Sequence, residues 1–182
     1  IDSYHEGQTL SSAYKSLMDN SLWSGSYITV GIFYETLSSK LIWQMFDNVS
    51  IGLARYTELI YTFLFKILLV YFTFLVSNFL KVSTFNKNIF FIINSIILLT
   101  LIDYDKSTVD LLSFREIPII FLLIAFTFLV KGNQSNFVLF VISSLSVLSL
   151  IWGVDRGLIC NLLIFIIILF LLIKRNYRSV II

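Results

Sequence analysis

Five long apolar stretches, separated by short polar segments, dominate the pattern of this chain. They cover residues 57–80, 89–102, 111–130, 137–153 and 158–173. An α-helix needs about 20 apolar residues to cross the roughly 30 Å hydrocarbon core of a bilayer, and the 89–102 stretch is short for this. The pattern predicts an all-α, polytopic membrane protein with about five spans.

The first 56 residues carry a different pattern, with apolar positions at helical spacing among polar ones. Two such stripes are Leu10, Ala13, Tyr14, Leu17 and Met18, and then Leu37, Leu41, Ile42, Met45 and Phe46. Each predicts an amphipathic helix, and we expect the two helices to lie on the membrane surface. Two helices packed on a soluble core are the alternative. The predicted division is an extracytoplasmic segment 1–56, a transmembrane domain 57–173 and a basic cytoplasmic end 174–182.

Charged residues sort by side when the chain is threaded through a bilayer at each apolar stretch. One side holds all eleven acids: Asp2, Glu6, Asp19, Glu35, Asp47, Glu58, Asp103, Asp105, Asp110, Glu116 and Asp155. The other side holds only Lys81, Lys87, Lys131, Lys174, Arg175 and Arg178. Short loops rich in Lys and Arg stay in the cytoplasm, so the acidic side is predicted to face out.

Composition supports a membrane protein and excludes a nucleic-acid partner. Hydrophobic residues make up 58% of the chain and charged residues 13%, whereas soluble domains carry about 25% charged residues. The net charge of +2 does not indicate nucleic-acid binding, because the basic residues stand at helix ends and form no patch.

Three ionisable residues at helical spacing open the chain. Asp2, His5 and Glu6 stand at i, i+3 and i+4, which places them on one face of a helix. Such a cluster at the mouth of a membrane span is typical of proton transfer or metal binding. A solvated loop with a chance His is the alternative.

Asp103-Tyr104-Asp105 follows the second apolar stretch. Two carboxylates at this spacing can hold a hard divalent cation such as Mg²⁺ or Mn²⁺, which in turn holds a phosphate. We therefore predict Asp103 and Asp105 as metal ligands, with an ordinary acidic loop as the simpler interpretation.

Two adjacent charge pairs, Arg115-Glu116 and Asp155-Arg156, stand at helix ends on the acidic side. Arg forks suit phosphate oxygens, so we predict that these residues bind the phosphate of a lipid-linked substrate. Alternatively, each Arg only neutralises the carboxylate beside it. Lys66, in the middle of the first apolar stretch, either faces a cavity or snorkels to the surface.

The whole arrangement resembles the GT-C type membrane glycosyltransferases, a superfamily that includes protein mannosyltransferases and the catalytic subunit of oligosaccharyltransferase. The resemblance rests on the early acid Asp2, two surface helices with Trp, and an Arg-led span preceded by Ser50-Ile51-Gly52-Leu53-Ala54-Arg55. It implies that Asp2 is the catalytic carboxylate, Glu6 a second acid, and Asp103 and Asp105 a metal-holding pair. His5 is not a signature of the family, and members normally have eleven or more spans.

The resemblance implies transfer of a sugar from a polyprenyl-phosphate donor to a glycan or lipid acceptor, on the extracytoplasmic side of a bacterial plasma membrane. Because the chain opens at Ile1-Asp2 and stops after a basic cluster, we expect a fragment of a larger protein. Two alternatives stay open. A transporter or flippase would use Lys66 and the outer carboxylates to line a polar path, and a non-catalytic assembly subunit would make no bond.

Overall fold

The computed structural model describes residues 3–21, 28, 31–101, 114–131 and 136–173, and the all-α prediction is confirmed for them. Seven α-helices and two short helical turns make up these described residues. In chain order they are α1 (Ser3–Met18), the π-helical turn η1 (Phe33–Leu37), α2 (Ser38–Phe46), α3 (Ile51–Ser77), α4 (Thr84–Leu101), the 3-10 turn η2 (Phe114–Glu116), α5 (Ile117–Val130), α6 (Asn136–Trp152) and α7 (Val154–Ile173).

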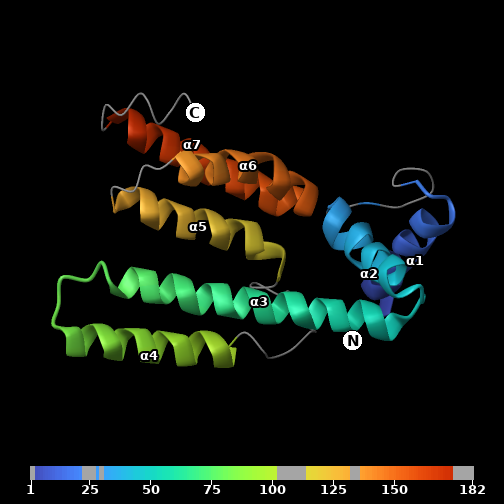
Figure 1. The fold of residues 1–182 in the computed structure, drawn as a ribbon, viewed down its shortest axis with the longest axis horizontal. Helices are drawn as coiled ribbons and strands as arrows, with labels where there is room; N and C mark the ends of the chain where they lie inside the picture. The colour runs from blue at the N-terminus through green and yellow to red at the C-terminus, as the bar shows by residue number, and fades with distance from the viewer. Residues whose placement is uncertain (1–2, 22–27, 29–30, 102–113, 132–135, 174–182) are drawn as a thin grey trace.

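Helices α3 to α7 form a layered bundle and run alternately in opposite directions (Figure 1). Each begins within a few residues of a predicted apolar stretch. Of the described helices, α3 and α7 are long and apolar enough to cross a membrane, while the apolar segments of α4, α5 and α6 are shorter. With 27 residues, α3 is about 40 Å long at 1.5 Å per residue.

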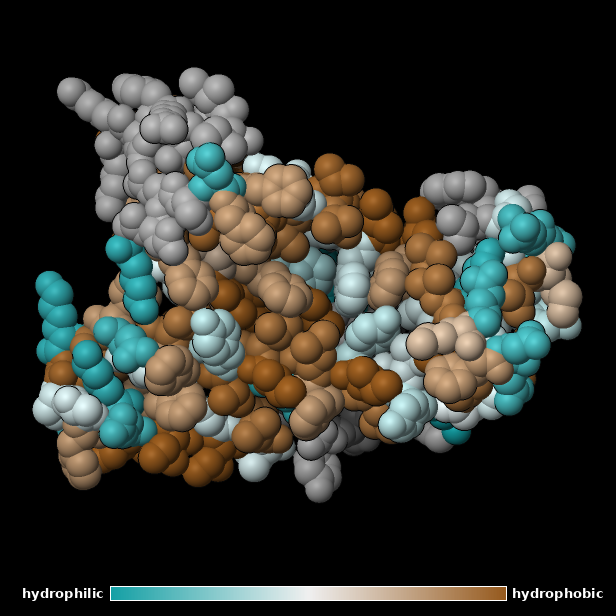
Figure 2. Space-filling view, viewed as in Figure 1, coloured by the Kyte–Doolittle hydropathy of each residue, from teal (hydrophilic) through white to brown (hydrophobic). Residues whose placement is uncertain are grey.

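Two apolar clusters hold the bundle together. One joins α5, α6 and α7 around Leu122, Leu145 and Ile164. The other joins α3 to α5 around Phe65, Ile120 and Ile124. On the face shown in Figure 2, hydrophobic side chains also cover most of the middle, and the strongly hydrophilic ones gather mainly towards the two ends. An apolar interior with an apolar exterior is what a bundle in lipid requires.

The segments α1, η1 and α2, here called the cap, pack on one another and on the start of α3 (Figure 1). Their small apolar core joins Ala13, Trp43 and Ala54, so α3 completes it. Left-handed residues end both helices of the cap: Asn20 (φ 47°) follows α1, and Asp47 (φ 46°) follows α2. Asn and Asp tolerate this conformation better than other non-glycine residues, which explains why the helices stop there.

Polar contacts cross the inside of the cap. The hydroxyls of Ser12 and Thr36 lie 2.8 Å apart, and both residues are buried. The Lys40 ammonium, buried to 7% exposure, donates to the Ser16 carbonyl (2.9 Å) and the Ser16 hydroxyl (3.1 Å). Carbonyls in the last turn of a helix lack partners within it, so Lys40 supplies a hydrogen-bond donor at the C-terminal end of α1.

Charge separates the two ends of the bundle. Every described acid lies in the cap or near the end of the bundle beside it, here called the cap end. The opposite end carries Lys81, Lys87 and Lys131, and the Lys131 ammonium lies 5.1 Å from the centre of the Phe79 ring. The predicted sorting of acids to one end is therefore present in the described residues, although Arg55, Arg115 and Arg156 also lie at that end.

Candidate functional site

Four of the predicted site residues form one ion-pair cluster at the cap end. Arg115 and Glu116 come from η2, and Asp155 and Arg156 from the first turn of α7. The pairs cross between these segments: Arg115 Nη2 lies 2.6 Å from Asp155 Oδ2, and Arg156 Nε lies 2.6 Å from Glu116 Oε1. Each Arg thus pairs with a carboxylate 40 positions away in the chain, and Arg156 Nη1 also lies 3.7 Å from Oδ2 of its neighbour Asp155.

The two carboxylates of the cluster differ in exposure. The Glu116 side chain is 9% exposed, whereas the Asp155 side chain is 44% exposed. Both Arg side chains are about one-fifth exposed. The cluster therefore has a buried pair, Arg156 with Glu116, and an accessible pair, Arg115 with Asp155.

A polar clamp fixes α7 against α6 below the cluster. The Asn161 amide donates to the Ser146 carbonyl (3.0 Å) and to the Gly157 carbonyl (2.9 Å), and its oxygen accepts from the Ser146 hydroxyl. Gly157 allows the two backbones to approach, because a Cβ there would lie 2.7 Å from Leu150 Cα. The position of Arg156 relative to α6 is thus set by close contacts.

The cap touches the bundle at the turn between α6 and α7. A Cβ on Gly31 would lie 2.4 Å from Gly153 Cα and 2.6 Å from the Trp152 carbonyl oxygen. Phe33 stacks on Trp152 with ring centres 4.3 Å apart, and the edge of Tyr61 meets both rings. Any side chain at position 31 would collide with Gly153, which stands two positions before Asp155 of the ion-pair cluster.

Glu35 secures this junction from within the cap. Its buried carboxylate accepts the Gly31 N–H at 3.2 Å, and it lies in the π-helical turn η1. Turns of this kind occur often at functional sites. Glu35 is not among the predicted site residues, because no motif in the sequence distinguishes it from the other acids of the first 56 residues.

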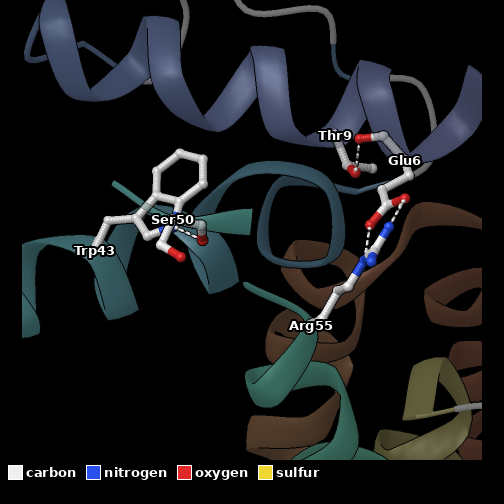
Figure 3. Close-up of polar contacts among 5 residues, drawn as sticks. All are labelled: Glu6, Thr9, Trp43, Ser50 and Arg55. Carbon is white, nitrogen blue, oxygen red and sulfur yellow. Dashed lines mark hydrogen bonds and ion pairs between the residues drawn. The ribbon is translucent and has the colours of Figure 1, made fainter. Parts of the chain in front are cut away.

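Glu6 binds α1 to α3 (Figure 3). Arg55 Nε donates to one carboxylate oxygen at 2.6 Å and Arg55 Nη2 to the other at 2.9 Å. Both oxygens are engaged in this two-pronged pair, which favours an anchoring role for Glu6 over proton transfer. In the same region the Trp43 ring N–H donates to the Ser50 carbonyl at 2.8 Å and holds α2 at the entrance to α3 (Figure 3).

The remaining predicted site residues are placed only in part. His5 lies in the first turn of α1, one position before Glu6. Asp2, Asp103 and Asp105 lie outside the described residues. Within the described ranges, no group of three His, Cys, Asp or Glu side chains is arranged to hold a metal ion.

Comparison with known proteins adds no relative. No protein-family model, no curated protein and no solved structure matches the chain.

Proposed function

We propose that the chain forms part of a membrane glycosyltransferase that moves a sugar from a polyprenyl-phosphate donor to a glycan or lipid acceptor. The observation that carries the proposal is the ion-pair cluster, in which Arg115 and Arg156 from separate helices meet at the cap end. Two converging guanidinium groups are suited to a phosphate with several charged oxygens.

In this proposal all five bundle helices cross the membrane. The cap end, which holds every described acid, faces the extracytoplasmic side, and the opposite end, whose described charges are all Lys, faces the cytoplasm. The ion-pair cluster then lies at the level of lipid headgroups, where the phosphate of a lipid-linked sugar is found. An α5–α6 groove of about 250 Å³, lined by Phe121, Phe128 and Phe137 among others, offers an apolar surface to a lipid chain.

The chemical roles follow from the types of residue. Asp2 takes the proton of the acceptor hydroxyl as general base, while Arg115 and Arg156 stabilise the charge on the departing lipid phosphate. Asp103 and Asp105 would hold Mg²⁺ or Mn²⁺, which would add a further positive charge at the phosphate. Glu6 positions α1, and with it the segment that carries His5, through its pair with Arg55.

The test is sugar transfer in membranes that contain the full-length protein, with a panel of radiolabelled polyprenyl-phosphate sugars as donors. Asp2→Asn removes the proton acceptor and preserves its shape, so we expect transfer to fall about 10²–10⁴-fold. Asp19→Asn is the matched control, because Asp19 is an exposed acid just past the end of α1. Its transfer rate should equal that of the unmodified protein.

Equal transfer rates for Asp2→Asn and Asp19→Asn, at equal protein level, would remove Asp2 from the mechanism. A transporter or flippase would move the lipid-linked sugar across the bilayer and leave the sugar–phosphate bond intact. Translocation of labelled donor without release of lipid phosphate would therefore contradict the transferase proposal and favour that alternative.

A further inference from the structure

The geometry points to a phosphate site between Arg115 and Arg156 that Asp155 itself occupies when no ligand is bound. This inference rests on the proposed function for the identity of the ligand, a phosphate carried by a lipid. The consequence is that Asp155 competes with the ligand, whereas Glu116 holds the site together.

A single oxygen shows where the anion would bind. Asp155 Oδ2 lies 2.6 Å from Arg115 Nη2 and 3.7 Å from Arg156 Nη1. It therefore lies between two guanidinium groups from different segments of the chain. A phosphate oxygen is negatively charged, like a carboxylate oxygen. Both form shorter and stronger hydrogen bonds with Arg than a neutral acceptor does. The carboxylate oxygen marks the place that a phosphate oxygen would take.

Exposure determines which carboxylate can leave. The Asp155 side chain is 44% exposed, so water solvates it at little cost when it is displaced. Exposed ion pairs of this kind contribute little to stability. The Glu116 side chain is 9% exposed, and removing the partner of a buried charge is costly. Glu116 is thus expected to keep Arg156 in place while a ligand replaces Asp155 at Arg115.

The inference predicts an effect of unusual sign: loss of an acid from the site should tighten binding. With Asp155→Asn, the ligand no longer has to displace an internal anion. An exposed pair is worth about 0.2–1 kcal/mol, so the dissociation constant for a phosphate ligand should fall up to about 5-fold. Arg115→Gln should weaken the same binding, because it removes one of the two cations.

Direct binding measures this without any turnover. The full chain is placed in phosphatidylcholine nanodiscs and titrated with farnesyl phosphate, inorganic phosphate or farnesol. We expect Asp155→Asn to bind farnesyl phosphate more tightly than the unmodified chain and to bind farnesol equally well. Stronger binding of farnesyl phosphate than of inorganic phosphate identifies the lipid as the source of the phosphate, and equal binding identifies free phosphate.

Asp47→Asn is the matched control. It removes the same charge from an exposed residue, and Asn tolerates the left-handed backbone at this position (φ 46°). Its affinity for farnesyl phosphate should equal that of the unmodified chain. Equal tightening in both variants would show a general effect of net charge and would overturn the inference, as would unchanged or weaker binding in Asp155→Asn. Tighter binding in a protein that transfers no sugar would retain the phosphate site and reject the transferase.

Discussion

The cap and the bundle bury different kinds of side chain. The bundle buries apolar side chains in two clusters. In α2 of the cap, the buried side includes Ser38 and Lys40, whereas Leu41, Met45 and Phe46 are exposed, Met45 to 79%. The cap is therefore held by a small apolar core around Trp43 together with a few directional hydrogen bonds, and the bundle by two larger apolar clusters. Substitution of a buried polar residue should therefore affect the cap more sharply than the bundle.

The junction between the two regions should be the most sensitive point. Gly31→Ala places a Cβ 2.4 Å from Gly153 Cα, so backbone must move on at least one side. We expect the contact between the cap and the α6–α7 turn to lose about 3 kcal/mol of stability, the upper end for overpacking. The cap should then separate from this turn more often. Hydrogen exchange should rise in peptides that cover η1 and this turn.

Gly7→Ala is the control for the junction, since nothing lies within 4 Å of a Cβ at that position. Ala is favoured over Gly inside a helix by about 0.5–1 kcal/mol, so α1 should become slightly more protected. Equal exchange at the α6–α7 turn in the two variants would contradict the junction described here.

Within the cap, Lys40 should matter next. Lys40→Met keeps the length of the side chain and removes both hydrogen bonds to Ser16. Leaving a buried carbonyl without this partner should lower the stability of the cap by about 2 kcal/mol. The measurement is the rate of proteolysis of α1, which should rise. Lys15→Met, at an exposed position of α1, should leave proteolysis unchanged, and a similar loss in both variants would argue against the capping role of Lys40.

The bundle should tolerate loss of its polar clamp better. Asn161→Leu removes the hydrogen bonds to Ser146 and Gly157, and side-chain hydrogen bonds between membrane helices contribute about 1 kcal/mol. The midpoint temperature of thermal unfolding in detergent should fall slightly, with little change in the hydrogen exchange of the cap. If Asn161→Leu lowered stability more than Lys40→Met does, the bundle would be the more sensitive of the two regions, contrary to the expectation.

The smallest effect should come from the exposed pair of Glu6 and Arg55. Glu6→Gln removes a charge attraction that salt screens over about 10 Å at 0.1 M ionic strength. Proteolysis of α1 should be slightly faster than in the unmodified chain at low salt and equal to it at 1 M salt. A difference that persists at 1 M salt would show that the pair does more than attract by charge.

The sequence predicted the helices better than their contacts. Apolar periodicity located α1 and α2, and Pro118 in the first turn of α5 fits a residue that the start of a helix tolerates. The sequence did not show which side of α2 is buried, because burial depends on what packs against the helix. Serines suit contacts between membrane helices, but their presence in α6 does not tell which of them make such contacts: Ser149 is buried and Ser146 joins the clamp, whereas Ser143 is exposed.

The ion-pair cluster shows the same limit. The alternative interpretation of the sequence, in which each Arg neutralises the carboxylate beside it, pairs Arg115 with Glu116 and Arg156 with Asp155. The structure crosses these partners between η2 and α7, which requires knowledge of how the two helix ends meet. The contact of Gly31 with Gly153 was equally invisible, since an isolated glycine has no signature that names its neighbour.

The central claim is that the helices of the bundle cross a membrane and that the acidic cap end faces outward. Alkaline phosphatase fused to the full-length protein tests it most directly, because the enzyme is active only after export from the bacterial cytoplasm. A fusion after Val109 should be active, and a fusion after Lys131 should be inactive. Activity after Lys131, or its absence after Val109 at equal protein level, would contradict the claim.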